Sequence, residues 1–317
     1  MTEKTFSQRI LVAVDGSDQA LEAVRYISGI VQRKRTEIVL FHVGTEYPEV
    51  YWDMDRNPYY KTKMNNVQGW LANHQLVMGE FKEKAAKVLK DAGFEPDAIH
   101  LKMQPQKIDI LRDIVQESYQ DYSAVVVGRS GTSRWKDVVV GSLSDKLVRR
   151  IRHIPLIIVG GTGLDSTRVF IALDESFESM RSVGMVGMLT GERIEEIILC
   201  HVLRLPGMFR VSPAWLQPTE REMDWLAYRR NRFRPTMDEA EQRLRDAGVA
   251  PERISRQFLT LKGNPVPIVI EAAMGGNYGT VVVGQGEVVG FFEEYILGRF
   301  HQKVIRSTEN MAVWVVS

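Results

Sequence analysis

Residues 9–17 read RILVAVDGS, and residues 168–176 read RVFIALDES. Each stretch is a short apolar run that ends in an aspartate, and the two start 159 residues apart, at 168 against 9. The same offset relates IVLFHV, which starts at Ile38, to IILCHV, which starts at Ile197. A pattern that recurs at a fixed offset indicates that the chain contains two copies of one structural unit.

The repeat continues to the end of each half of the chain. The run AVVVG ends at Gly128 and its counterpart TVVVG ends at Gly284. Between the halves, residues 160–166 read GGTGLDS, a glycine-rich stretch that suits a short linker. We therefore expect two domains, residues 1–163 and residues 164–317, which agrees with the length of the chain.

Within each half, short apolar runs alternate with helical patterns. Continuous runs rich in β-branched residues are typical of strands that are buried on both faces. In the first half, the expected strands are Ile10 to Val14, Ile38 to Val43, Ala98 to Met103, Ala124 to Val127 and Leu156 to Val159; the expected helices are Asp18 to Gln32 after the N-cap Ser17, Phe81 to Asp91 before Gly93, about Ile108 to Tyr119, and about Leu143 to Arg152. This order predicts an α/β fold: two tandem doubly wound, Rossmann-like domains, each a five-stranded parallel sheet flanked by helices.

A long segment follows the second strand of each half, and both segments are rich in aromatic residues. Segments of this length tend to be functional lids or to carry short helices of their own. We expect their aromatic side chains to pack over the sheet edge rather than to form an exposed partner surface. These side chains are Tyr47, Tyr51, Trp52, Tyr59, Tyr60 and Trp70 in the first segment, and Phe209, Trp215, Trp225, Tyr228 and Phe233 in the second.

Composition and charge exclude several classes of protein. The chain of 317 residues is 44% hydrophobic and 26% charged, which is typical of a soluble globular protein. No apolar run is long enough to cross a bilayer, and the start MTEKTFSQRI has no signal-peptide core, so we expect a cytoplasmic protein without a membrane partner. The formal charge of +1 gives no reason to expect nucleic acid as a partner. The single cysteine, Cys200, lies in an apolar run and is expected to be buried.

In a doubly wound sheet, ligands bind beyond the carboxyl ends of the strands, where the winding reverses. The first such end is Asp15-Gly16-Ser17. Asp15 is placed to accept a hydrogen bond from a ribose hydroxyl or an adenine amine, and Gly16 allows a sharp turn. The alternative is that Asp15 only caps the following helix.

The second strand ends at Val43, whose backbone groups could read an adenine edge. The histidines His42 and His201 occupy equivalent positions in the two halves. A lone histidine in a strand is more often a hydrogen-bonded core residue than a catalyst. The histidines show no metal-ligand spacing, so no metal site is predicted.

The fourth strand is followed by GRSGTSRWKDVVVGS, residues 128–142. Gly128 and Gly131 allow a close approach of the backbone to phosphate oxygens. Gly141 and Ser142 add backbone N–H groups and a hydroxyl at a helix N-terminus, where the dipole favours an anion. The alternative is a strand-to-helix loop that happens to be rich in glycine. The sequence is neither a Walker A loop nor a dinucleotide-binding fingerprint.

The aspartate after the first strand, the G-x2-G-x9-G-S pattern and the terminal IPLIIV strand together resemble the universal stress protein family. With the duplication, the resemblance covers nearly the whole chain. The chain is similar to the tandem-domain branch of the family, in which one chain contains two family domains. It implies domains that hold ATP, with or without Mg²⁺, between the ends of strands one and four. Carried over by position, it implies a nucleotide site of Val14, Asp15, Val43, Gly128, Ser130, Gly131, Gly141, Ser142, Leu143 and Ser144. Lys136 is our own addition to this site, as a cation for the phosphates or simply as a solvated loop lysine.

The second half departs from this pattern. Gly284-Gln285-Gly286-Glu287 replaces G-x-x-G, and Arg299 stands where Ser142 stands in the first half. Glu293 and Glu294 add carboxylates, which repel phosphate groups. We therefore expect weak or no ATP binding in this half. Asp174 and Val202 keep the adenine end, so a nucleoside without phosphates remains possible there, and recruitment of an anion by Arg299 is the weaker interpretation.

The favoured function is that of a cytoplasmic ATP-binding protein of stress response or signalling, with the adenine nucleotide in the first domain only. One alternative is slow ATP hydrolysis at the same site, although no general base is evident, so no catalytic residue is predicted. Another is an interaction scaffold that binds no nucleotide. The resemblance also implies an intramolecular pseudo-dimer that joins at the strands Leu156 to Val159 and Ala312 to Val316, with a homodimer of chains and an unidentified protein partner as open questions.

Overall fold

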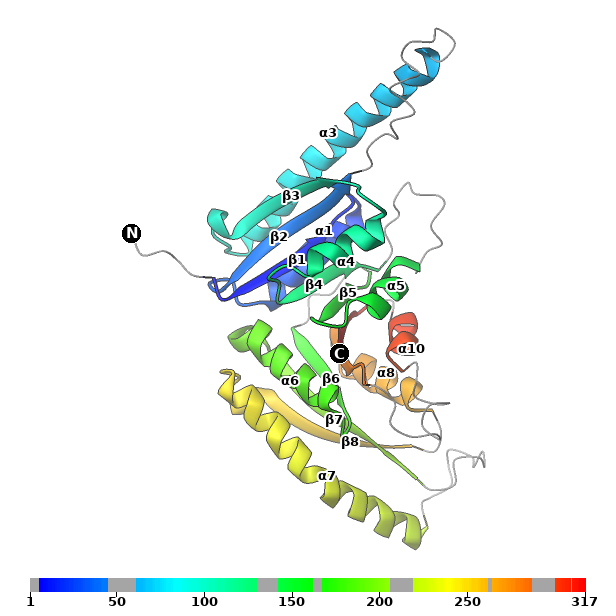
Figure 1. Cartoon of the computed structure of the whole chain (residues 1–317). Helices are drawn as coiled ribbons and strands as arrows, with labels where there is room; N and C mark the ends of the chain where they lie inside the picture. Colours follow the sequence, from blue (N-terminus) through cyan, green and yellow to red (C-terminus); the bar gives the residue numbers. More distant parts are fainter. Residues whose placement is uncertain are drawn as a thin grey trace. The chain divides into compact units, whose positions relative to one another are not determined.

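The structure is a computed structural model of the whole chain. It describes residues 6–44, 61–129, 142–161, 167–205, 219–261, 264–286, 300–308 and 310–317, without the side chains of residues 61–75 and 142. The chain divides into two compact units (Figure 1). The first contains Met1–Ser28 and Arg33–Arg150, and the second contains Gly29–Gln32 and Ile151–Ser317.

The sheet of the first unit is parallel. Its strands are β1 (Gln8–Ala13), β2 (Thr36–Gly44), β3 (Ile99–Pro105) and β4 (Ala124–Gly128), in the spatial order β3-β2-β1-β4. β1 lies between β2 and β4, with Ala13 opposite both Phe41 and Val127. The strand order therefore places the ends of β1 and β4 side by side, at the point where the winding reverses.

The helices of the first unit connect these strands. They are α1 (Asp18–Ile30), α3 (Lys61–Asp91), α4 (Ile110–Ser118) and α5 (Ser142–Arg150), with a short 3-10 turn at Pro96–Ala98. All four expected helices are present, but α3 begins at residue 61 rather than 81. Gly93 has φ +91°, and the amide of Phe94 donates to the carbonyl of Leu89, which confirms Gly93 as the residue that ends α3.

The second unit repeats this arrangement and adds one strand. Its strands are β5 (Leu156–Val159), β6 (Arg168–Leu173), β7 (Glu196–Arg204), β8 (Ile254–Leu261), β9 (Thr280–Gly284) and β10 (Ala312–Val316), in the order β5-β10-β9-β6-β7-β8. The five strands β6 to β10 pair in parallel, as expected, whereas β5 pairs antiparallel with β10. The winding reverses between β6 and β9.

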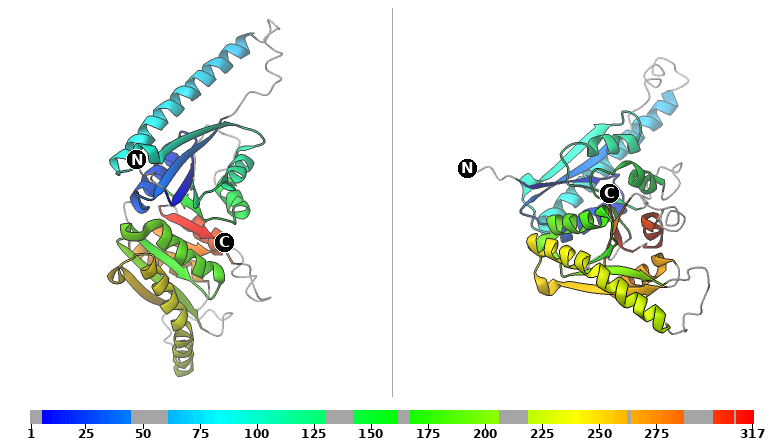
Figure 2. Two further views of the ribbon diagram at one scale, coloured as in Figure 1. Left: turned by 60° about the vertical axis from the view of Figure 1, so that its left-hand side comes forward. Right: turned by 60° about the horizontal axis from the view of Figure 1, so that its bottom comes forward.

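Helices cover both faces of this sheet. They are α6 (Phe177–Thr190), α7 (Glu220–Asp246), α8 (Pro265–Gly275) and α10 (Phe300–Ser307), with 3-10 turns at Gly191–Arg193 and Pro251–Arg253. α6 and α7 lie side by side on one face, and α8 and α10 lie on the other (Figures 1 and 2). The predicted α/β fold with mostly parallel sheets is confirmed.

The strands form the core of each unit because they are buried on both faces. All residues of β5 and β10 are buried, as are Ala124 to Val127 of β4. Burial of apolar surface stabilises the fold by about 25 cal/mol per Å², and these strands bury side chains on both faces. Their sequences are therefore unbroken apolar runs. No helix in the described ranges is both long and apolar enough to span a bilayer.

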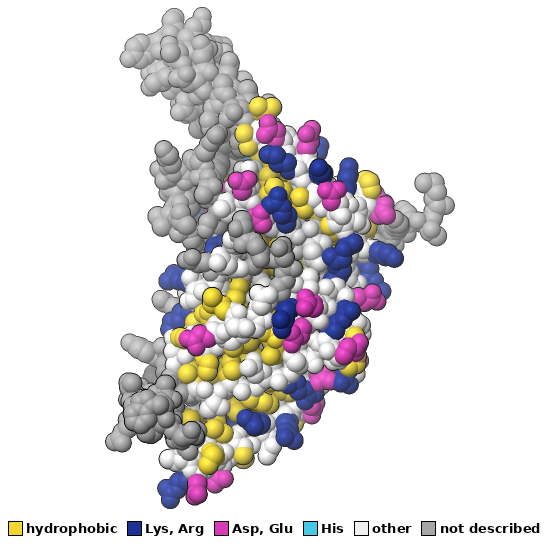
Figure 3. Space-filling model, turned by 180° about the vertical axis from the view of Figure 1, so that it is seen from behind, with side chains coloured by type: hydrophobic (Ala, Val, Ile, Leu, Met, Phe, Trp, Pro, Cys, Tyr) yellow, Lys and Arg dark blue, Asp and Glu magenta, His cyan; other side chains and the backbone are white. Residues whose placement is uncertain are grey.

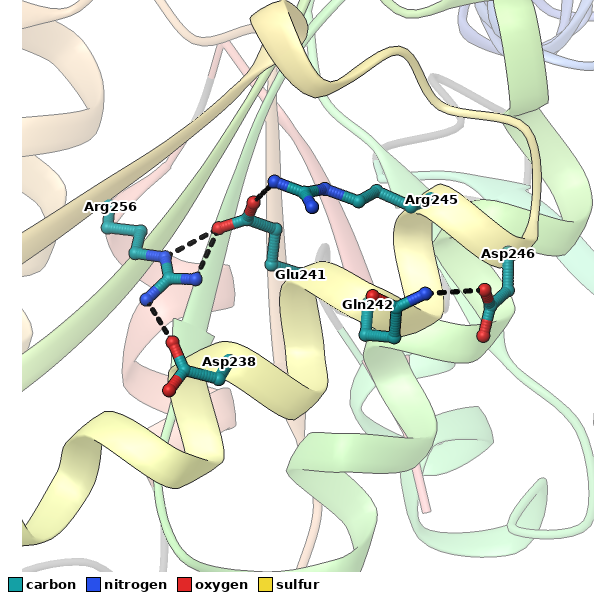
Figure 4. A network of polar contacts seen from close by, with 6 residues as sticks. All are labelled: Asp238, Glu241, Gln242, Arg245, Asp246 and Arg256. Atoms are coloured by element: carbon teal, nitrogen blue, oxygen red, sulfur yellow. Dashed lines mark hydrogen bonds and ion pairs between the residues drawn. The ribbon is translucent and has the colours of Figure 1, made fainter.

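A network of ion pairs fastens α7 to β8 (Figure 4). The guanidinium of Arg256 on β8 donates to Glu241 Oε2 at 2.6 Å and to Asp238 Oδ1 at 2.5 Å. Glu241 also accepts from Arg245 one turn further along α7. Because Glu241 is mostly buried, at 13% side-chain exposure, this carboxylate shared by two arginines holds the helix at a fixed position along the strand.

The surface carries charges of both signs. On the face shown in Figure 3, Lys and Arg side chains alternate with Asp and Glu, and hydrophobic side chains gather in patches between them. Mixed charge of this kind produces no large field of one sign on that face. It agrees with the formal charge of +1 and gives that face no general attraction for polyanions.

Candidate functional site

The end of β1 in the first unit forms a tight polar turn. Asp15 Oδ1 accepts hydrogen bonds from the amide of Ser17 at 3.0 Å and from its hydroxyl at 2.5 Å. Ser17 Oγ in turn accepts from the amide of Ala20 at 3.2 Å, which confirms Ser17 as the cap of α1. Asp15 thus supports the cap through one carboxylate oxygen, and the hydrogen bonds described for it leave Oδ2 for a ligand.

Gly16 lies in this turn with φ +81°, a conformation that favours glycine. A Cβ atom at this position would lie 3.1 Å from Met78 Sδ and 3.3 Å from Val77 Cγ1. Both neighbours belong to α3, so this helix packs directly against the end of β1.

The end of β2 lies one strand further along. Val43 is buried and pairs with Gln104 of β3. His42 is buried as well, and its Nδ1 lies 2.8 Å from the carbonyl of Val14. Because a carbonyl only accepts, Nδ1 carries the proton and the ring fixes Val14 in place. His42 is therefore a hydrogen-bonded core residue, as predicted.

The end of β4 packs against the start of α1. A Cβ atom on Gly128 would lie 3.0 Å from the carbonyl oxygen of Gln19 and 3.3 Å from its Cβ. At such distances only glycine fits without movement of the backbone, so Gly128 brings the end of β4 onto the N-terminal turn of α1. Asp15 and Gly128 consequently lie at the same edge of the sheet, on neighbouring strands.

The start of α5 reaches the same edge. Ser142 is the first residue of α5, Leu143 is half-buried and Ser144 is buried. The hydroxyl of Ser144 lies 3.5 Å from the carbonyl of Arg129, the residue that follows β4. The structure thus joins the β4 end to α5. The predicted site residues Ser130, Gly131 and Gly141, together with Lys136, lie outside the described residues.

The second unit repeats the turn but changes its charge. Asp174 Oδ1 accepts from the amide of Ser176 at 2.9 Å, and Ser176 Oγ accepts from the amide of Ser179 at 3.1 Å. Gly16 is replaced by Glu175 and Gln19 by Glu178, so carboxylates stand at two positions that are uncharged in the first unit, while Asp18 of the first unit is replaced by Phe177. Both glutamates would repel phosphate groups at short range.

The two acidic side chains are held in different ways. Glu175 lies 3.6 Å from the guanidinium of Arg232 on α7. Glu178 lies beside the end of β9, because a Cβ atom on Gly286 would be 3.2 Å from Glu178 Oε2. The carboxylates Glu293 and Glu294, which the sequence adds to this half, and Arg299, which replaces Ser142, lie outside the described part of the chain.

Sequence reasoning missed both carboxylates, although the repeat contains the signal. The 159-residue offset that aligns Asp15 with Asp174 also aligns Gly16 with Glu175 and Gln19 with Glu178. The helix dipole alone ordinarily explains an acidic residue such as Glu178 in the first turn of α6, and an exposed carboxylate such as Glu175 in the preceding turn needs no special explanation.

His201 is the counterpart of His42 and is equally buried. Its Nδ1 lies 2.8 Å from the carbonyl of Leu173, and its ring stacks on Phe233 of α7 with 3.5 Å between centroids. Burial lowers the pKa of His201 below its ordinary value, because the charged imidazolium loses its hydration, and this outweighs the hydrogen bond to Leu173.

We expect His201 to make the second unit less stable in mild acid. Its folded pKa lies below its unfolded pKa of about 6.5, so the unfolded chain binds more protons between these values. The contribution of neutral His201 to the free energy of unfolding is therefore complete above about pH 6.5. It declines as the pH falls, by at most about 1.4 kcal/mol per pH unit. Urea unfolding at pH 7.5 and at pH 5.5 should show a smaller acid loss in His201→Gln than in the wild type, and equal losses would contradict this assignment.

Cys200 is 1% exposed, as predicted, and burial raises the pKa of its thiol to about 12. A thiol with this pKa stays protonated at neutral pH and is a poor nucleophile. Across the described residues, no three His, Cys, Asp or Glu side chains come together in a way that could hold a metal ion.

Comparison with known proteins gives one family. The profile described as the universal stress protein family matches the chain twice, at residues 7–160 and 166–317. The universal stress protein YxiE of Bacillus subtilis is 27% identical over 164 residues, which cover 48% of this chain and 97% of that protein.

Solved structures show the same fold over nearly the full length. A universal stress protein from Archaeoglobus fulgidus superposes with a TM-score of 0.62 at 17% identity, covering 99% of this chain and 98% of that one. A protein of unknown function from Pseudomonas aeruginosa, PA1789, superposes with a TM-score of 0.52 at 12% identity, covering 98% and 92% of the respective chains. At these identities the likeness concerns the fold.

Proposed function

This chain belongs to the universal stress protein family as a tandem of two family domains, and from this premise we propose that it is a cytoplasmic nucleotide-binding protein of stress response or signalling. The ligand is an adenine nucleotide, ATP, with or without Mg²⁺, and only the first unit holds it. Nucleotide occupancy would alter the shape of the chain or its choice of partner.

The observation that carries this proposal is the meeting of Asp15 and Gly128 where the winding of the first unit reverses. Such a point is where doubly wound sheets bind their ligands. Asp15 offers a carboxylate to the ribose or the base, while the N-terminus of α1 and the start of α5 offer backbone N–H groups to an anion.

The remaining roles follow the strand ends. Backbone groups of Val14 and Val43 would read the adenine. Residues after β4 would surround the ribose and phosphates: Gly128, Ser130, Gly131, Gly141, Ser142, Leu143 and Ser144. Lys136 would offset phosphate charge. Mg²⁺, where present, would arrive on the phosphates and retain most of its water ligands.

The second unit supports the restriction to one site. Its equivalent turn carries Glu175 and Glu178, and the Glu178 carboxylate lies against the residues that follow β9. A phosphate chain placed there would meet like charge from the half-buried Glu178 and the exposed Glu175, so Coulomb repulsion would weaken its binding.

We further propose that the chain is an intramolecular pseudo-dimer joined at its terminal strands. The antiparallel pairing of β5 with β10 supports this, since β5 belongs to the first family match and β10 to the second. Light scattering of the purified chain would show whether two chains associate further.

Asp15→Asn tests the site directly. The amide keeps an oxygen for the Ser17 cap but removes the charge that would accept from the nucleoside, so we expect affinity for ATP to fall about 10- to 100-fold. Equilibrium dialysis of intact chains gives this ratio. The matched variant Asp174→Asn in the second unit should bind ATP as the wild type does. Absence of ATP binding by the wild type would refute the proposal, and so would equal effects of the two variants.

A further inference from the structure

We propose that one position of the repeat decides which unit accepts a phosphate-bearing ligand. This position is Gln19 in the first unit and Glu178 in the second. The inference rests on the proposed nucleotide site and names the residue that makes it selective: a neutral amide admits phosphates, whereas a carboxylate in the same place excludes them.

The two residues occupy the same place in the fold. Gln19 is the second residue of α1 and Glu178 is the second residue of α6. Each follows a serine cap that is held by an aspartate, Ser17 by Asp15 in the first unit. The only change at this position is therefore that of an amide for a carboxylate of the same length.

Both residues lie at the edge of the sheet where the winding reverses, in contact with the end of β4 in the first unit and with the end of β9 in the second. A Cβ atom on Gly128 would lie 3.0 Å from the carbonyl oxygen of Gln19, and one on Gly284 would lie 3.0 Å from the carbonyl carbon of Glu178. The carboxylate of Glu178 reaches further, to within 3.2 Å of a Cβ atom on Gly286. Gly286 comes two residues after β9, as Ser130 comes two residues after β4.

Glu178 thus supplies an internal anion at the place where the first unit would hold ribose and phosphate. Its neighbour Glu175 has a cation at 3.6 Å in Arg232, whereas no ion pair of Glu178 occurs among the residues that the structure describes. Its charge is therefore the less compensated of the two, and it also takes up the attraction of the α6 N-terminus for anions.

Gln19 shows the complementary feature in the first unit. Its Oε1 is buried and has no hydrogen-bond partner within the described residues. A buried acceptor without a donor is costly, and ribose hydroxyls and the adenine amine are donors of the kind that it lacks. The neutral side chain thus adds no charge against phosphate and leaves an acceptor for the nucleoside.

Contacts from the helices α3 and α7 add to the difference in charge between the two turns. In the first unit, Val77 of α3 lies against Gly16. The helices α3 and α7 end at Asp91 and Asp246, and counting 14 residues back from each end places Arg232 at the position of Val77. Glu175 stands at the position of Gly16, and it forms an ion pair with Arg232. An apolar contact in the first unit is thus replaced by an ion pair in the second, so that Arg232 is partly neutralised and offers less to a phosphate.

The test is a charge series at position 19 of the full-length chain, with ATP and adenosine as separate probes in isothermal titration calorimetry. For a charge about 5 Å from a phosphate near the protein surface, Gln19→Glu should lower the affinity for ATP on the order of 100-fold. Adenosine has no phosphate, so its affinity should change by less than about 5-fold. Gln19→Lys should strengthen ATP relative to adenosine, and Gln19→Met serves as the neutral control of similar size.

An acidic residue in the first turn of a helix is favourable, so Gln19→Glu is expected to fold. Glu178→Gln should leave ATP binding by the first unit unchanged. The inference is overturned if affinities for ATP do not follow the order Lys, Gln, Glu, or if ATP and adenosine weaken equally. Failure of the wild type to bind ATP would instead overturn the proposed function, and the inference with it.

Discussion

Replacing Trp314 with alanine is expected to lower the free energy of unfolding by about 4 kcal/mol. Trp314 is fully buried in β10, opposite Ile157 of β5 on one side and Val282 of β9 on the other. Truncation would leave a large cavity between strands that are covered on both faces and have little freedom to collapse. The loss therefore combines the transfer free energy of the indole with the energy of the cavity.

Urea unfolding followed by circular dichroism would measure this loss. Trp225→Ala is the matched control, because Trp225 is 40% exposed and its indole donates a long hydrogen bond, 3.3 Å, to the carbonyl of Arg204. We expect this control to cost about 1 kcal/mol or less. Similar losses in the two variants would mean that β10 does not lie at the centre of the second unit.

Gly284→Ala is expected to destabilise the second unit by about 2 to 3 kcal/mol. An added Cβ atom would lie 2.7 Å from the amide nitrogen of Ser179 and 3.0 Å from the carbonyl carbon of Glu178. Both contacts are with backbone, which cannot rotate away as a flexible side chain could. The strand end and the first turn of α6 would have to separate, and the cap at Ser176 would be disturbed.

The control for this variant is Gly184→Ala in the middle of α6. Apart from the backbone of α6 itself, no heavy atom of the described residues lies within 4 Å of a Cβ atom at Gly184, so alanine should be neutral or should stabilise the helix by up to about 1 kcal/mol. Thermal unfolding of both variants separates close packing from helix propensity. A Gly284→Ala protein as stable as the wild type would contradict the close approach of β9 to α6.

The strands were predictable from the sequence because burial on both faces leaves an unmistakable pattern. Leu156 to Val159 was predicted and found with the same bounds, and Ala124 to Val127 differs from β4 by one residue. The serine cap of α1 and the glycine that ends α3 were predictable as well, since each satisfies a specific backbone requirement.

Only the part of α3 from residue 81 onward was predicted, and no helix was predicted at the position of α7. The buried residues of α7 are Phe233, Met237, Ala240 and Leu244, all in its C-terminal part. Its N-terminal part extends beyond this packed stripe and carries charges, and Pro235 lies inside the helix, so the periodic signal fails there. The prediction for the aromatic side chains holds for Phe233, which is buried, but not for Tyr228, which is 57% exposed.

The strand ends that form the candidate site were predictable from the sequence, whereas the residues that set its charge were not. Asp15 and Gly128 follow directly from strand ends, which the apolar runs mark. Gln19 gains meaning only when the start of α1 is brought against the end of β4, and Glu178 only when the start of α6 is brought against the end of β9, because each contact joins residues about a hundred positions apart. Distant contacts of this kind are not encoded in a local pattern.

The number of ATP molecules bound per chain tests the central claim most directly. Native mass spectrometry of the intact protein, titrated with ATP, should show a single bound nucleotide per chain, and the Asp15→Asn variant should show that population reduced. Two nucleotides per chain, with one of them lost in Asp174→Asn, would contradict the restriction to the first unit. No bound nucleotide at any concentration would contradict the nucleotide site itself.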